Sequence, residues 1–437
     1  MTRWLINRKR RAFQVFFLLL LALVGGMYLR SMPALSAQES TLENLRKFSE
    51  ILDIIEKNYV EEVDMEKLIE GAVQGMMKSL DPHSTYLTAE MYRELQVDTK
   101  GEFGGLGIVI SIKDEVLTVV SPIEDTPAFK AGIEAGDRIV KIDGEETAGI
   151  SIMDAVSKLR GPKGTDVTIS IMRDGFDRPK DYTITRDIIK IKSVRHRVLN
   201  DGVGYIRISS FQENTADDLK AALKELNSHN PPLWGLVLDL RNNPGGLLDQ
   251  AITVSDLFLK SGVIVTTKGR SSAESGKIYR ARDLGIEPNM PIIVLVNGGT
   301  ASGSEILAGA LRDNNRALLL GTQTFGKGVM QMIVPLRDGS ALKLTTAKYY
   351  TPSGVCIQAM GLTPDFVVDY RRPEIQEEKK TQLREQDLKG HIESESPMPD
   401  ALEPPYQTGE DFIIDNQLQH AIDLIKGWEL FKAMEKV

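Results

Sequence analysis

A serine set among small residues follows an apolar run in the second half of the chain. Ser302 stands in the segment 297–305, which reads N-G-G-T-A-S-G-S-E, directly after the apolar run 291–296. Small residues permit the sharp strand-to-helix turn that lifts a nucleophilic serine into the open. The spacing is not G-x-S-x-G, and a helix start with a serine and a nearby glutamate is the alternative interpretation. The segment is either a nucleophile turn or an ordinary helix start.

A serine nucleophile needs a base, and here the candidate is a lysine. Lys327 lies between two glycines, and Gln331 follows four residues later, whereas no histidine of this zone has a glycine-rich or strand-end context. A lysine acts as a base only if its pKa falls from about 10.4 toward about 7–8. Burial among apolar neighbours such as Phe325 would lower that pKa. Gln331 would orient the amine if the segment turns. Without a serine partner, the lysine would be a solvated charge.

A second strand end carries glycines. The segment 240–246 reads L-R-N-N-P-G-G, and the glycines Gly245 and Gly246 open an expected helix. Backbone N–H groups at such a turn stabilise negative charge. The turn could cradle a phosphate or form an oxyanion pocket, although no G-x-x-x-x-G-K-[ST] is present.

These segments fall in a zone where strands and helices alternate, 194–371. Apolar runs predict strands at 204–209, 234–240, 291–296, 316–321 and 342–350, and amphipathic spacing predicts helices at 215–226, 247–259 and 301–311. The alternation predicts a βαβ-rich α/β core, in which ligands bind where strands end and helices begin.

A zone of short Val- and Ile-rich strands precedes that core. Strands are expected at 107–112, 116–120, 139–142, 167–172 and 182–185, with helices at 126–131 and 151–159. The first strand follows Gly104, Gly105, Leu106 and Gly107, whose N–H groups could form a nest for a carboxylate beside a strand edge that accepts a peptide. With A-G-I at 131–133 and A-G-D-R-I at 135–139, this zone resembles a PDZ domain, a family that binds free C-termini.

The remaining segments are helical, charged or apolar. Residues 41–96 show helical spacing, with Asp64 as the cap of a second helix. A turn is expected within this range at 81–84, and His83 is predicted to be a turn histidine. This prefix would serve packing or dimerisation. Segment 371–410 combines charges with prolines and is typical of a mobile linker. The helix expected at 415–434 either docks on its own protein or forms an oligomer contact.

The N-terminus predicts export. Basic residues at 8–11 precede the apolar run 15–29, and 34–36 offers a small-x-small cleavage site. A cleaved signal and a retained membrane anchor are both open, and either places the bulk of the chain outside the cytoplasm. A buried core helix is the weaker alternative.

Composition limits the remaining classes. The chain has 437 residues, which indicates two to four domains at roughly 100–200 residues each. Its net charge of −8 argues against a nucleic-acid binder. The single cysteine excludes an internal disulfide, and the five scattered histidines argue against a structural zinc. No cofactor is expected.

The combination of N-G-G-T-A-S-G-S-E, T-F-G-K-G-x-x-Q and N-N-P-G-G-L resembles the tail-specific, carboxyl-terminal processing proteases. The resemblance extends from about residue 42 to 370, and it implies an exported serine endopeptidase with a serine–lysine dyad and an embedded PDZ domain. By this resemblance Ser302 is the nucleophile, Lys327, 25 positions on, is the base, and Gln331 supports it. The oxyanion donors are then the N–H of Gly303 and one from Gly245 or Gly246. The letters at 300 and 303 depart from the family's commonest ones, but neither side chain carries the reaction.

The expected organisation is a mixed α/β multidomain fold. It comprises a signal or anchor (1–37), a helical region (41–98), a PDZ domain (99–190), a protease core (191–371), a charged linker (372–410) and a C-terminal helix (411–437). The export signal and the lack of cysteine pairs predict a periplasmic location, soluble or anchored to the inner membrane, with a thylakoid-type lumen or a cell-surface setting as alternatives. The resemblance implies self-assembly. It also implies a helper lipoprotein or adaptor, and substrates among cell-wall hydrolases or membrane proteins with free, apolar C-termini. The rivals are a catalytically silent or partner-gated peptide-binding scaffold and an α/β domain that binds a small apolar ligand.

Overall fold

The computed structural model describes residues 41–113, 115–199, 202–270, 276–285, 287–371 and 414–434, and the chain divides into two compact units, 1–80 and 81–437. The predicted signal or anchor at 1–37 and the predicted linker at 372–410 lie outside the described residues. Within the described ranges, no helix combines the length and the apolar character needed to cross a membrane.

The N-terminal unit is helical, as its spacing predicts. Residues 41–58 form one helix and α2 (Met65–Lys78) a second, with Asp64 as the N-cap accepting from the N–H of Lys67 at 3.2 Å. Apolar side chains of the first helix remain exposed in this unit, among them Leu42, Leu45 and Phe48.

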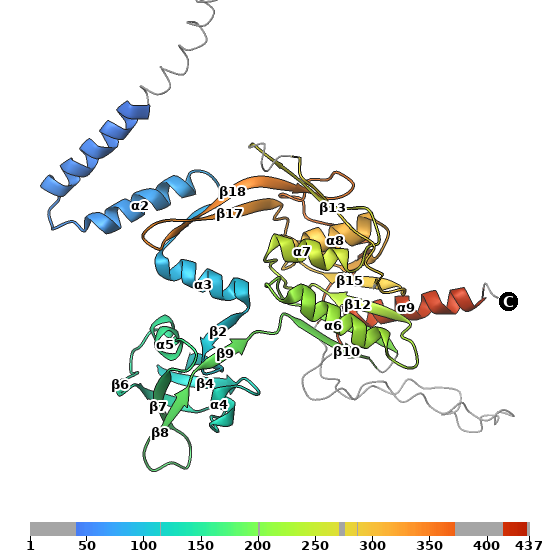
Figure 1. The fold of residues 1–437 in the computed structure, drawn as a ribbon, viewed down its shortest axis with the longest axis horizontal. Coiled ribbons are helices and arrows are strands. Elements are labelled where there is room, and N and C mark those ends of the chain that lie inside the picture. Colours follow the sequence, from blue (N-terminus) through green and yellow to red (C-terminus); the bar gives the residue numbers. More distant parts are fainter. Residues whose placement is uncertain are drawn as a thin grey trace, which may run out of the picture. The chain divides into compact units, whose positions relative to one another are not determined.

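The second unit begins with a small β-rich region (Figure 1). Its main sheet has the order β3-β4-β5-β7-β8, with β6 beside β5, and a separate pair joins β2 to β9. The elements are α3 (Ala89–Lys100), β2 (Glu102–Gly105), β3 (Ile108–Lys113), β4 (Val116–Pro122), α4 (Pro127–Lys130), β5 (Arg138–Ile142), β6 (Glu145–Glu146), α5 (Ile152–Leu159), β7 (Asp166–Met172), β8 (Lys180–Thr185) and β9 (Asp187–Lys190). All five predicted strands and both predicted helices are present.

The carboxylate-loop prediction needs one correction. Gly104 and Gly105 end strand β2 and pair with β9, so only Leu106 and Gly107 form the loop before β3. Gly107 has φ +78°, and a Cβ there would lie 2.3 Å from Thr126 Cβ, so this position requires glycine. The local glycine pattern could not show the pairing with β9, because that strand is some 80 residues away.

The α/β core is built on a six-stranded sheet of order β10-β11-β12-β15-β16-β19. Its strands from β11 to β19 are parallel, and β10 is antiparallel. The elements are β10 (Val194–Val198), β11 (Val203–Ile208), α6 (Thr215–Asn227), β12 (Gly235–Asp239), α7 (Leu248–Asp256), β15 (Ile292–Val296), α8 (Gly303–Asp313), β16 (Leu318–Gly321), β19 (Phe366–Val367) and α9 (Asn416–Met434).

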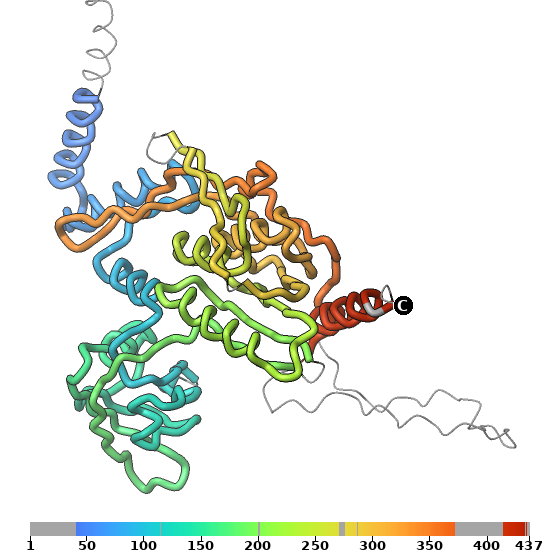
Figure 2. Tube along the Cα trace, turned by 45° about the vertical axis from the view of Figure 1, so that its right-hand side comes forward, coloured from blue at the N-terminus to red at the C-terminus, as the bar shows by residue number. Residues whose placement is uncertain are grey.

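The two faces of this sheet bury different helices. Side chains such as Leu236 and Leu238 pack with α6, α7 and α8, whereas Val237 on the opposite face packs with Leu418 and Ile422 of α9. Alternate residues of a strand point to opposite faces, so a strand buried on both sides is apolar throughout. The N-terminal half of α9 therefore docks on its own protein, one of the two alternatives left open by the sequence (Figure 2).

The strand predicted at 342–350 does not complete the core sheet, and that prediction was wrong. β18 (Ala341–Tyr350) forms an antiparallel hairpin with β17 (Val329–Pro335), joined by a short turn in which Leu336 N–H donates to Ser340 O. The second sheet has the order β1-β18-β13-β14, with β1 (Thr85–Leu87), β13 (Val263–Gly269) and β14 (Ile278–Arg280). A short turn pairs β18 with its sequence neighbour β17, and this pairing places β18 in the second sheet and not in the core sheet.

Candidate active site

Ser302 occupies a sharp turn between β15 and helix α8. It is the N-cap residue of α8, with φ +56° and ψ −113°. This combination is rare for a residue with a side chain and is found at strained functional turns. The geometry matches the nucleophile turn suggested by the small flanking residues. The half-buried Ser302 is therefore both the start of a helix and the residue at a sharp turn, so the two features that the sequence offered as alternatives coincide.

The buried carboxylate of Glu305 ties this turn to the lysine loop. Its Oε2 accepts from the N–H groups of Ser302 and Lys327, both at 2.9 Å. Its Oε1 accepts from Gly326 N–H at 2.8 Å and Thr324 Oγ1 at 2.6 Å. Four donors converge on one fully buried side chain. The sequence suggested Glu305 only as a capping residue, and its spacing from Ser302 was the sole signal.

Lys327 and Gln331 meet as their spacing suggested. Lys327 Nζ donates to Gln331 Oε1 at 2.9 Å, and Gln331 Nε2 donates to the carbonyl of His83 at 2.5 Å. Gln331 lies on β17, with a register shift between Met330 and Gln331, and Lys327 precedes this strand, so the contact does not depend on the turn that the sequence suggested.

Burial lowers the pKa of the Lys327 amine below its usual value, and the positive charge of Lys343 lowers it further, while Asp81 acts in the opposite direction. The direction agrees with the requirement for a base. The suggested cause needs correction, because the Phe325 side chain is 63 % exposed and turns to solvent. Desolvation by burial also lowers the pKa of His83, with a further contribution from the charge of Lys327.

The glycine turn after β12 contacts the serine turn directly. A Cβ on Gly245 would lie 2.8 Å from Ser302 Cβ and 2.9 Å from Gly303 N, and Gly245 has φ +103°. The N–H of Gly245 donates to Asn243 Oδ1 at 2.9 Å, so it is not free to bind an oxyanion. Within the described chain no acceptor is assigned to the N–H of Gly246.

Asparagines join the two turns through main-chain and side-chain groups. Asn243 is fully buried, and its side-chain Nδ2 donates to Ile208 O. The main-chain carbonyl of Asn243 accepts from Ala301 N–H and Ser304 Oγ. Asn297 accepts from the N–H of Asn242 at 2.9 Å. The carboxyl ends of β12 and β15 are thus fixed against one another.

One groove brings the predicted residues together. A cleft of about 1070 Å³ is lined by Gly245, Gly246, Ser302, Lys327 and Gln331. Apolar and aromatic side chains complete it, among them Phe211, Leu248, Tyr279, Val329, Met330 and Tyr349. Gly303 is buried at the start of α8, where its N–H has no intrahelical acceptor.

The predicted peptide-binding loop lies at a separate, smaller hollow. It is lined by Gly105, Leu106, Gly107, residues of β3, and Val156, Leu159 and Arg160 at the end of α5. Strand β3 is an edge strand, since among the described residues it pairs only with β4. Arg160 stacks over the Phe103 ring at 4.6 Å from the centroid.

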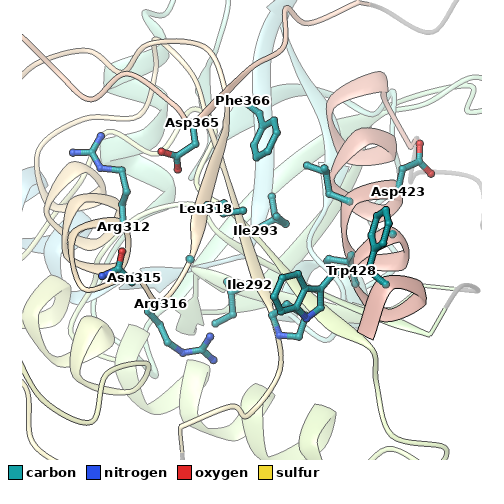
Figure 3. A pocket seen from close by; sticks show the side chains of 16 residues that line it. Ile292, Ile293, Arg312, Asn315, Arg316, Leu318, Asp365, Phe366, Asp423 and Trp428 are labelled. Atoms are coloured by element: carbon teal, nitrogen blue, oxygen red, sulfur yellow. The ribbon is translucent and has the colours of Figure 1, made fainter. Parts of the chain in front are cut away.

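A third cavity holds none of the predicted site residues. It has a volume of about 610 Å³ and lies between α9 and the sheet, with Ile293 and Leu318 from the strands facing Trp428 from α9 (Figure 3). Arg312, Arg316, Asp365 and Asp423 also line it.

The chain matches family models of a peptidase and of a PDZ domain. Residues 202–368 match the model of peptidase family S41, residues 118–173 that of the PDZ domain, and residues 29–91 that described as the activating protease CtpB N-terminal domain. A carboxy-terminal-processing protease of Bartonella bacilliformis is 46% identical over 413 residues, which cover 92% of this chain and 95% of that protein. The chain belongs to peptidase family S41.

The chain is also similar to a second curated protein and to a solved structure. The carboxy-terminal processing protease CtpA of Bacillus subtilis is 36% identical over 81% of this chain and 77% of its own length. A solved photosystem II D1 C-terminal processing protease is 32% identical, with a TM-score of 0.44, over 74% of this chain and 92% of its own. This S41 chain is thus a serine peptidase with a PDZ domain, and the groove around Ser302 is its candidate active site.

Proposed function

We propose that this S41 peptidase is an exported endopeptidase in which Lys327 activates Ser302. The observation that carries the proposal is the partly buried amine of Lys327. It donates to Gln331 and opens, with Ser302, into one groove. Lys327 takes the proton of Ser302 Oγ, which attacks the substrate carbonyl. The N–H groups of Gly303 and Gly246 stabilise the oxyanion.

Lys327 then passes the proton that it took from Ser302 to the leaving amine. The C–N bond breaks as the Lys327 ammonium protonates the departing amine, which leaves an acyl group on Ser302. Neutral Lys327 next takes a proton from water, and the hydroxide attacks the acyl carbonyl. The second tetrahedral intermediate collapses with release of Ser302 Oγ, which recovers its proton from Lys327.

Substrates are recognised by their free C-termini in this proposal. The N–H groups of Leu106 and Gly107 donate to no other group of the described chain, so both can bind a terminal carboxylate. The open edge of β3 accepts the tail as an added strand. Val156 and Leu159 favour an apolar terminal side chain.

Amidation of the substrate C-terminus tests this recognition. A protein substrate with a free apolar tail is expected to be cleaved with a kcat/KM at least about tenfold higher than the same substrate amidated, because the loop N–H groups lose a charged acceptor. Fragments quantified by mass spectrometry give both rates. The control is a substrate in which the same tail sequence lies inside the chain and therefore has no free C-terminus. Equal rates would contradict recognition by the PDZ loop.

The charge of Lys343 provides a pH test of the base. The active form is neutral Lys327, so activity rises with pH through the pKa of Lys327. Because Lys343 lowers that pKa, Lys343→Gln is expected to raise it and to move the ascending limb of kcat/KM to higher pH. Lys348→Gln, at an exposed position of the same strand β18, is the control. A limb that stays in place or moves to lower pH would contradict the assignment.

The setting of the enzyme belongs to the same proposal. The N-terminal segment 1–37 directs the chain to the periplasm, as a soluble protein or anchored to the inner membrane. Cell-wall hydrolases or membrane proteins are its substrates, a lipoprotein adaptor delivers them, and the enzyme self-assembles. The name of the family model matched at 29–91 supports a role of this region in activation.

The alternative function is a silent or partner-gated peptide-binding scaffold. A hydrolysis assay with and without added partner separates it from the protease. Cleavage by the isolated chain excludes both forms of the scaffold, and cleavage only with a partner selects the gated form.

A further inference from the structure

A loop far from Ser302 in the sequence reaches the base. Residues 81–84 precede β1, which pairs with β18, and β18 pairs with β17. The loop thereby lies close to Gln331 of β17, whose Nε2 donates to the carbonyl of His83 at 2.5 Å across 248 positions of sequence.

The Asp81 side chain holds this loop in shape. Its Oδ1 accepts from the N–H groups of His83 and Ser84, both at 2.8 Å, and its Oδ2 accepts from Ser84 Oγ at 2.7 Å. Thr345 of β18 fastens the loop to the sheet, since its Oγ1 donates to Asp81 at 3.2 Å and its N–H donates to Ser84 Oγ at 3.1 Å. Ser84 is buried.

The carbonyl of His83 determines which end of the Gln331 amide faces Lys327. A carbonyl can only accept, so the NH₂ group of Gln331 must point to His83 and the oxygen is left for Lys327. An oxygen that accepts an N–H of Lys327 directs the amine lone pair elsewhere. A reversed amide would present N–H groups to the amine and compete for that lone pair.

From these contacts we infer that Asp81 is a positioning residue for catalysis, acting through the His83 carbonyl and Gln331 on the amine of Lys327. The inference rests on the proposed role of Lys327 as the base. Because Asp81 touches neither the peptide loop nor Ser302, its loss affects the chemical step and leaves substrate binding unchanged.

Kinetics of full-chain variants test the inference. Asp81→Ala is expected to lower kcat by about 10- to 100-fold with KM within about twofold of the parent, since a small misplacement of a catalytic group has effects of this size. Asp81→Asn keeps the Oδ1 acceptor and is expected to restore kcat to within about threefold of the parent. Asp338→Ala removes a similar turn carboxylate at the far end of the β17–β18 hairpin, where Asp338 accepts from Ser340, and should leave kcat unchanged.

A double-mutant cycle separates positioning from a general structural effect. If Asp81 acts through Gln331, Asp81→Ala adds no more than about twofold to the loss already caused by Gln331→Ala. A full additional loss in the double variant, or parental kcat in Asp81→Ala, would overturn the inference. Ser84→Ala enters the cycle if Asp81→Ala does not fold. Parental kcat in Lys327→Ala would instead remove the proposed base, whereas additive losses with an inactive Lys327→Ala enzyme would overturn only the role of the loop.

Discussion

Lys327→Ala is expected to lower kcat/KM by as much as Ser302→Ala, about 10³- to 10⁶-fold, because groups that act as one catalytic unit are not additive. The Ser302→Ala, Lys327→Ala double variant should then be no worse than either single variant. The partly buried amine, its lowered pKa and its hydrogen bond to Gln331 are the physical basis. Steady-state hydrolysis of a protein substrate with an apolar tail measures all three.

Lys327→Arg extends this prediction. Arginine keeps the positive charge but cannot be deprotonated in a protein, so this variant should be as inactive as Lys327→Ala. Lys348→Ala, on the exposed side of β18, is the control and should keep parental kcat/KM. Activity in Lys327→Arg above a few per cent of the parent would show that the lysine supplies charge and not a base.

Glu305→Gln is expected to remove most activity and to destabilise the fold. The carboxylate accepts from four donors, two at each oxygen. An amide would turn one oxygen into a donor that faces two other donors, and each buried group left unpaired costs about 1–3 kcal/mol. We expect kcat/KM to fall by about 100-fold or more, because the serine turn and the lysine loop lose their common support.

Thermal unfolding and hydrolysis, measured on the same preparation, check this second prediction. Glu225→Gln is the control, since Glu225 is an exposed partner of His196 and should change neither quantity. An active Glu305→Gln enzyme with an unchanged unfolding midpoint would contradict the role of the carboxylate.

Local patterns predicted most of the helices and strands, whereas the roles of Ser302, Lys327 and Gln331 rested on the family resemblance and stay predictions. The strand β15 is apolar on both faces, and small residues must follow it if the chain is to turn sharply at Ser302. The contact between Lys327 and Gln331 was expected only if their segment turned, and it forms without such a turn, beside a register shift in β17. The N-cap at Asp64 was also predicted correctly from its side-chain type.

Contacts between distant segments could not be predicted in this way. Glu305 looked like a helix cap, because its contacts with Gly326 and Lys327 span 21 and 22 positions. The His83 turn was recognised, but its contact with Gln331 depends on β1 pairing with β18. The same limit explains the assignment of Gly104 and Gly105 to a loop, since their partner strand β9 is distant in sequence. The wrong sheet for 342–350 has a different cause, because its hairpin partner β17 was not predicted as a strand. Pairing partners, and not propensity, decide these features.

Labelling with a fluorophosphonate, followed by peptide mapping, tests the central claim most directly, because the reagent bonds covalently to an activated serine. The account predicts one adduct, on Ser302, in the parent and a labelling rate in Lys327→Ala reduced by about 10³-fold or more. An enzyme that cleaves protein but carries the adduct on another residue, or a Lys327→Ala variant labelled at the parental rate, would contradict it.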